Sequence, residues 1–122
     1  MSLPFEREKF DAISCVHAFS HVIENDRLKV AEELSRVLKK EGHVLVEVFG
    51  RNDLRYGEGE QIEKATFLRG NGIQTHYFQE GEVARMFSKL SPMSEVTQVR
   101  RITLGTIAGK REILRILLRK NR

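Results

Sequence analysis

Two short apolar runs separated by a helical pattern constrain the fold of this chain most strongly. Phe10–Val16 and His43–Phe49 carry many β-branched and other apolar residues with little polar alternation, a pattern typical of buried parallel strands. Between them a stripe of apolar residues recurs at helical spacing, namely Val30, Ala31, Leu34, Val37 and Leu38. A strand, a helix and a second strand within about 40 residues predict a βαβ unit with a right-handed crossover.

The ends of the expected helix are marked by residues that favour helix termini. Asn25 or Asp26 can cap the first turn. Lys39 and Lys40 suit the last turn, where positive charge interacts favourably with the helix dipole. Gly42 can then supply the left-handed residue that ends a helix. The sequence therefore predicts a helix that continues through Lys40.

The remainder of the chain continues the α/β pattern. The polar stretch from Gly50 to Ala65 is expected to be a loop just past the carboxyl end of a strand, where open α/β sheets place ligand-binding loops. The later elements are predicted from β-prone and amphipathic patterns: strands Thr66–Arg69 and Ile73–Phe78 as a hairpin around Gly70-Asn71-Gly72, helix Glu80–Leu90 stopped by Pro92, and strands Val96–Leu104 and Ile113–Leu118 joined by an antiparallel turn that holds Gly105 and Gly109.

Length and composition fit one globular domain over residues 1–122. Apolar residues make up 40% and charged residues 31% of the chain, which excludes an intrinsically disordered protein. The single cysteine, Cys15, excludes an internal disulfide and favours a reducing, cytoplasmic location. We expect no membrane association, because no apolar run reaches the ~18 residues of a membrane span and the start does not resemble a signal peptide.

The positive charge of the chain is concentrated near its end. The formal charge is +4, and six cations and one anion lie between Lys110 and Arg122. Such a cluster can contact nucleic acid or form a solvated face beside a buried strand. Aromatic residues that could stack on bases are scarce near it, so the solvated face is favoured.

In the order of several short motifs, the chain resembles the class I S-adenosylmethionine-dependent methyltransferases of the small-molecule type. Leu3-Pro4-Phe5 precedes a strand that begins Phe10-Asp11, the helix ends in Val37-Leu38-Lys39-Lys40-Glu41-Gly42, and His76-Tyr77-Phe78 leads toward the next helix. The resemblance covers almost the whole chain. It implies an α/β fold: a partial Rossmann-like sheet with strands corresponding to 4-5-7-6 of the family, the last strand antiparallel, flanking helices and a β-hairpin insertion.

The glycine-rich turn by which this family holds its cofactor is not found. The two Gly-x-Gly triplets, Gly57-Glu58-Gly59 and Gly70-Asn71-Gly72, lack a third glycine at the required spacing, where Ile62 and Thr75 stand. The chain is therefore expected to be the C-terminal portion of a methyltransferase domain without the N-terminal cofactor-binding half, and to be inactive by itself.

The resemblance also implies which residues lie near the cofactor, S-adenosylmethionine, and its acceptor. The cofactor contacts expected by position are Pro4, Phe5, Cys15, Val16, His17 and Phe19, while Tyr56 and His76 are expected to contact the substrate. Packing in the core is the alternative for Val16 and Phe19. No residue is assigned a catalytic role, although His17, His21 or His76 could act as a general base rather than as packing histidines. No metal site is expected.

The expected function is methyl transfer to an unidentified small-molecule acceptor, and nucleic acid is not expected as a partner. A non-catalytic alternative stays open. Without a neighbouring strand, Phe10–Val16 would form an exposed, apolar sheet edge, which favours pairing with another chain. The alternative is therefore a remnant that forms a homodimer through this edge, or binds a chain that supplies the missing strands.

Overall fold

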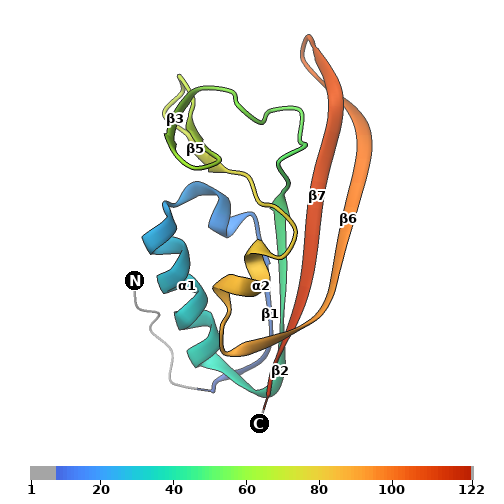
Figure 1. Cartoon of the computed structure of the whole chain (residues 1–122). Coiled ribbons are helices and arrows are strands. Elements are labelled where there is room, and N and C mark those ends of the chain that lie inside the picture. The colour runs from blue at the N-terminus through green and yellow to red at the C-terminus, as the bar shows by residue number, and fades with distance from the viewer. Residues whose placement is uncertain (1–7, 122) are drawn as a thin grey trace.

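The computed structural model describes residues 8–121 as a two-layer α/β fold with a small second sheet at one end (Figure 1). Its elements, in chain order, are β1 (Phe10–Val16), the 3₁₀ helix η1 (Ala18–His21), α1 (Glu24–Val37), β2 (Leu38–Phe49), β3 (Glu60–Glu63), β4 (Thr66–Leu68), β5 (Gln74–His76), α2 (Glu82–Met86), β6 (Leu90–Leu104) and β7 (Ile107–Lys120). Neither helix within this range is long and apolar enough to cross a membrane.

The larger sheet confirms the predicted topology. Its strand order is β1-β2-β7-β6, with β1 parallel to β2 and β7 antiparallel to β2. Strand β6 then pairs antiparallel with β7. This arrangement corresponds to the expected order 4-5-7-6 with an antiparallel last strand, and β1-α1-β2 is the expected βαβ unit.

Both helices pack against the same face of this sheet, and the core lies between them and the strands (Figure 1). Val44, Val46 and Val48 point toward this core and are fully buried, whereas Leu45 points to the other face and is 38% exposed. The core cluster consists of Cys15, Phe19, Ala31, Leu38, Val44, Val46, Val48, Phe78, Val83, Phe87, Leu90, Leu114, Ile116 and Leu118. The expectation of fully buried strands is thus wrong for residues 8–121, in which the helices cover one face only.

The predicted end of the first helix is also wrong. Helix α1 ends at Val37, so Lys39 and Lys40 belong to β2. Gly42 does not adopt a left-handed conformation, and a Cβ atom there would lie 2.7 Å from the backbone oxygen of Asp11. Glycine is needed because it lets β2 pass close to β1, at the point where the register between the two strands shifts.

The segment between β2 and α2 forms a second sheet. The predicted hairpin is confirmed by the antiparallel pairing of β4 with β5, although both strands are shorter than expected. The expected loop of residues 50–65 contains the additional strand β3, which pairs with β4. A four-residue strand whose residues are mostly exposed leaves little apolar pattern by which the sequence could reveal it.

The C-terminal hairpin is longer than its apolar pattern predicts. Strand β6 begins at Leu90, which shortens the preceding helix, and it includes Pro92, which an edge strand tolerates. Gly105 lies in the short turn between β6 and β7 with φ 61°, but Gly109 belongs to β7. A Cβ atom at Gly109 would lie 2.9 Å from that of Leu54, so this glycine permits close packing of the loop after β2.

Candidate functional site

The carboxyl ends of the two parallel strands bring His17 and Phe49 together. His17 directly follows β1, has a left-handed backbone with φ 58°, and donates its backbone N–H to the oxygen of Glu47 at 2.7 Å. Its ring stacks on the Phe49 ring, with 4.2 Å between the centroids. The guanidinium of Arg111, from β7, also lies over Phe49, at 4.3 Å from the ring centroid. Three planar groups therefore meet at this edge of the sheet.

The surroundings of His17 favour an uncharged imidazole. Burial lowers the pKa of His17, and the nearby charge of Arg111 lowers it further, while Glu47 opposes both effects. The Nδ1 atom of His17 is buried and has no hydrogen-bond partner within residues 8–121. A buried nitrogen without a partner is costly, so this atom marks a position where a ligand could supply a hydrogen bond.

Asp53 fixes the loop that follows β2. Its side chain is fully buried, and its carboxylate accepts hydrogen bonds from Arg111 Nε at 3.0 Å and Arg111 Nη2 at 3.1 Å. The backbone N–H of Glu112 donates to the same carboxylate at 2.9 Å. The Glu112 carboxylate in turn accepts two hydrogen bonds from Asn52, both at 3.1 Å. These bonds hold Arg111 over Phe49, because a paired guanidinium loses its rotational freedom.

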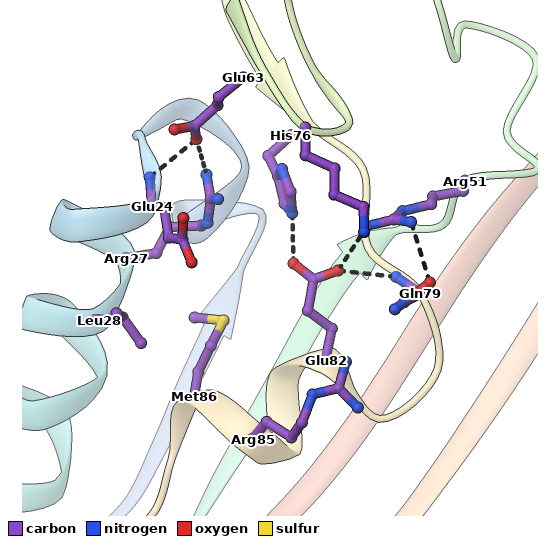
Figure 2. Close-up of a pocket in the computed structure, with 11 residues that line it drawn as sticks. Glu24, Arg27, Leu28, Arg51, Glu63, His76, Gln79, Glu82, Arg85 and Met86 are labelled. Carbon is purple, nitrogen blue, oxygen red and sulfur yellow. Dashed lines mark hydrogen bonds and ion pairs between the residues drawn. The ribbon is translucent and has the colours of Figure 1, made fainter.

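A second cluster lines a cavity of about 290 Å³ between α1, α2 and the small sheet (Figure 2). The imidazole of His76 is almost fully buried and bonded at both nitrogens. Its Nδ1 lies 2.7 Å from the Thr66 hydroxyl, and its Nε2 lies 2.5 Å from a carboxylate oxygen of Glu82. Because a carboxylate only accepts hydrogen bonds, Nε2 is the protonated nitrogen and donates to Glu82.

Glu82 connects this histidine to the strand end of β2. Burial raises the pKa of the Glu82 carboxyl, but the hydrogen bond from His76, a backbone N–H of Gln79 and the charge of Arg51 outweigh it, so that the pKa lies below the usual value. Arg51 Nη2 lies 3.5 Å from Glu82, and Arg51 Nη1 donates to the side chain of Gln79 at 3.0 Å. Figure 2 shows these side chains converging from β5, α2 and the loop after β2.

The opposite wall of the cavity ties the small sheet to α1. The Glu63 carboxylate accepts the backbone N–H of Glu24 at 2.9 Å, at the first residue of α1. It also forms an ion pair with the nearly buried Arg27 at 3.1 Å. Helix α1 has no capping side chain at its own Ile23, so a carboxylate from β3 satisfies a free N–H there and interacts favourably with the helix dipole.

Of the six residues expected at the cofactor, the four that the structure describes differ in burial. Pro4 and Phe5 lie outside the described residues. Val16 is 54% exposed at the strand end beside His17, whereas the Cys15 side chain belongs to the core. Burial raises the pKa of the Cys15 thiol, which keeps it protonated. Phe19 is fully buried against Phe87, with ring centroids 5.7 Å apart, which favours the core-packing alternative for this residue.

The two residues expected at the substrate lie on the small sheet and its connections. Tyr56 is 42% exposed and packs edge-to-face on Phe67 and Tyr77, with centroid distances of 5.1 and 5.6 Å. His76, the residue before Tyr77, points instead into the cavity of Figure 2. The structure therefore gives an exposed aromatic ring at one position and a buried imidazole at the other.

Sequence reasoning missed the partners of these residues. Arg111 lies 58 residues from Asp53, and Arg27 is likewise distant in sequence from Glu63, so no local spacing reveals these pairs. Glu82 lies only six residues after His76, but nothing in the sequence marks it as the partner of that imidazole. The proximity of His17, His21 and Cys15 in sequence does not produce a metal set: within residues 8–121, no three His, Cys, Asp or Glu side chains are placed to hold a metal ion.

Comparison with known proteins agrees with the resemblance. Residues 1–46 match a family model described as a methyltransferase domain. Over 90 residues the chain is 29% identical to tRNA N(3)-cytidine methyltransferase METTL2 of Mus musculus and 30% identical to METTL2B of Homo sapiens, and each match covers 71% of this chain. The chain spans 23% and 24% of the length of these relatives.

A solved structure shows the same fold. The S-adenosylmethionine-dependent methyltransferase from Methanosarcina mazei superposes with a TM-score of 0.77 at 22% sequence identity, over 98% of this chain and 63% of that chain. At this identity the likeness shows the fold rather than the acceptor.

These findings correct one expectation and confirm another. The expectation of a small-molecule acceptor, with nucleic acid not expected as a partner, is wrong, because the curated relatives are named as tRNA methyltransferases. The predicted cofactor, S-adenosylmethionine, agrees with the family that the chain matches. Sequence similarity and fold together identify the chain as having the class I S-adenosylmethionine-dependent methyltransferase fold.

Proposed function

We propose that this chain forms the acceptor side of an enzyme that transfers a methyl group from S-adenosylmethionine to a cytidine base of tRNA. The observation that carries the proposal is the similarity to tRNA N(3)-cytidine methyltransferases over 90 residues, at 29% and 30% identity. The fold by itself supports many acceptors, so the sequence similarity decides between them.

The geometry at the strand ends supports a planar acceptor. RNA-binding proteins recognise unpaired bases by stacking them on aromatic rings and guanidinium planes. Phe49, His17 and Arg111 are such groups, and they meet beside the carboxyl ends of two parallel strands. This is the edge at which open α/β sheets bind their ligands.

The chemistry of the proposed acceptor suits the residues present. When bound, S-adenosylmethionine supplies an electrophilic methyl group on a positively charged sulfur. The N3 atom of a neutral cytosine carries a free electron pair, so attack on that methyl group does not require a strong base in the protein. Burial keeps the pKa of His17 low, so its uncharged ring would not repel the sulfonium group.

Of the residues expected at the cofactor and the substrate, some are proposed as direct contacts and one as an indirect contributor. Val16 and His17 are the best placed cofactor contacts, because Val16 is exposed and the Nδ1 atom of His17 has no partner within residues 8–121. Tyr56 is proposed as an acceptor contact through its exposed ring. The buried His76 would contribute indirectly, because it holds the Glu82 carboxylate that pairs with Arg51 in the cavity wall.

The domain assignment belongs to the same proposal. The two Gly-x-Gly triplets lack the spacing of a cofactor-binding turn and lie before β3 and between β4 and β5, so the groups that hold the cofactor's methionine end would come from outside residues 8–121. We therefore propose that the 122-residue chain alone is inactive. The cytoplasmic location remains a prediction from the single cysteine.

One observation favours the non-catalytic alternative. Within the part of the chain that the structure describes, β1 pairs with β2 only and leaves its other edge open. Self-association through this edge predicts a dimer in analytical ultracentrifugation and slow amide exchange in Phe10–Val16. A monomer with fast exchange in this strand would remove the alternative.

A segment exchange tests the methyltransferase proposal. The matched segment of mouse METTL2 is replaced by this chain, and the chimera is incubated with S-adenosylmethionine and tRNA. Digestion and mass spectrometry of the nucleosides should detect N3-methylcytidine. A chimera that folds and binds S-adenosylmethionine but yields no methylated cytidine would contradict the proposal. A Phe49→Ala chimera serves as the matched variant and should lose most of the product.

A further inference from the structure

The β6–β7 hairpin continues beyond the rest of the larger sheet. Strand β2 pairs with β7 only as far as the pair of Phe49 with Ile113. The part of β7 before Ile113 pairs with β6 alone, up to the pair of Leu104 with Ile107. Figure 1 shows this part projecting as a two-stranded ribbon next to the loop that follows β2. We call residues 99–112 the hairpin tip.

The hairpin tip contains two consecutive pairs of like charges. Arg100 lies directly opposite Arg111, and Arg101 lies directly opposite Lys110. Like charges at opposite positions of an antiparallel pair repel one another and destabilise the strand pairing. Adjacent residues of a strand point to opposite faces, so each face of the ribbon carries one such pair.

The negative charges near the tip do not neutralise these cations. Asp53 pairs with Arg111, and Glu112 is hydrogen-bonded to Asn52. Among residues 8–121, no carboxylate forms an ion pair with Arg100, Arg101 or Lys110, and all three side chains are exposed. The tip therefore keeps an excess of positive charge at its surface.

The loop after β2 lies against the hairpin tip. The backbone N–H of Leu54 donates to the oxygen of Lys110 at 2.8 Å, and the Leu54 side chain packs on Gly109. Because this loop starts at the end of β2, it connects the tip directly to the stacked rings of His17 and Phe49.

We infer that the hairpin tip binds the phosphodiester backbone of an RNA, with Arg100, Arg101 and Lys110 as the contacts. This inference rests on the proposed function and names where the RNA lies relative to the strand ends. Phosphate contacts position a nucleic acid without reading its sequence, and they relieve the repulsion between paired cations. A two-stranded ribbon with cations on both faces can contact phosphates on each of its two sides.

Fluorescence anisotropy with labelled tRNA and the 122-residue chain tests this inference. The double variant Arg100→Gln with Arg101→Gln should weaken binding about tenfold and reduce the salt slope of the binding constant by about 1 to 2. The matched control is Lys39→Gln with Lys40→Gln, which removes the same charge from exposed positions near the start of β2. The control should bind within about twofold of the original chain.

Three results would overturn the inference. They are the absence of tRNA binding by the original chain at about 50 mM salt, an equal loss in both double variants, and competition by poly-glutamate as effective as that by unlabelled tRNA. The last result would indicate an acidic protein as the partner.

The chimera separates this inference from the proposed function. If the chimera forms no N3-methylcytidine but tRNA binding still depends on Arg100 and Arg101, the hairpin tip binds RNA and the proposed reaction is wrong. If the chimera methylates cytidine and the double variant binds tRNA normally, the reaction stands and the inference about the tip is wrong.

Discussion

The two halves of β7 place their residues in opposite environments. Toward its C-terminal end, Leu114, Ile116 and Leu118 are buried under the helices, opposite Val44, Val46 and Val48 of β2. Toward its N-terminal end, Ile107 is 42% exposed, and Lys110 faces an arginine. One continuous strand thus carries a part that stabilises the fold and a part whose charges oppose pairing. Residues that oppose the fold locally often serve a binding function.

The comparison predicts the largest difference for equivalent truncations on the same strand. Ile116→Ala removes a fully buried side chain from the core and should lower the free energy of unfolding by about 2–5 kcal/mol. Ile107→Ala, on the same strand at the hairpin tip, should change it by less than about 0.5 kcal/mol. Urea denaturation followed by circular dichroism measures both. Similar losses would show that the tip is also part of the cooperative core.

The junction between the two halves should be sensitive to a single methyl group. At Gly50 an added Cβ atom would lie 1.9 Å from a carboxylate oxygen of Glu112, which holds Asn52. Gly50→Ala should displace this carboxylate and destabilise the fold by about 1–3 kcal/mol. Gly70→Ala, which has open space around it, is the control and should be almost neutral. If Gly50→Ala left the free energy of unfolding unchanged, the loop would have to accommodate the added methyl group without disturbing the Glu112 carboxylate.

The cavity cluster predicts a pH-dependent contribution to stability. The folded-state pKa of Glu82 lies below its usual 4.5, so its ionised form stabilises the fold above that pH, and the contribution is lost as the pH falls through the folded value. Glu82→Gln should cost about 1–3 kcal/mol at pH 7. It should cost less near pH 3. Glu80→Gln, at an exposed position, provides the control in the same titration of urea stability. A loss that does not shrink at low pH would contradict the ionic role.

The sequence predicted the parts of the fold that depend on local apolar periodicity. The βαβ unit, the β4–β5 hairpin and the antiparallel last strands follow from such patterns. It did not predict the end of α1, because Lys39 and Lys40 suit a helix locally, whereas β2 starts at Leu38, which pairs with Phe10 of β1. Tertiary pairing overrides local preference there.

The candidate site was less predictable for the same reason. His17 and Val16 could be placed at a strand end by counting along the chain. The stacking of Arg111 on Phe49, and the bond from His76 to Glu82, depend on which strands and loops meet in space. The cations of the tip illustrate the limit well. The basic cluster predicted from the sequence began at Lys110, and the strand register was needed to place Arg100 and Arg101 opposite Arg111 and Lys110.

The smallest predicted effect is that of Arg101→Glu, which should raise the stability of the chain but lower its affinity for tRNA. Arg101→Glu converts the repulsive pair with Lys110 into an attractive one and should stabilise the chain by about 0.2–1 kcal/mol at low salt. The gain should shrink at 1 M salt, because screening weakens interactions between exposed charges. The same variant should weaken tRNA binding more than Arg101→Gln does. If Arg101 were only part of a solvated surface, Arg101→Glu would raise the stability without weakening tRNA binding. If the variant lowered both the stability and the affinity for tRNA, Arg101 would contribute to the packing of the hairpin.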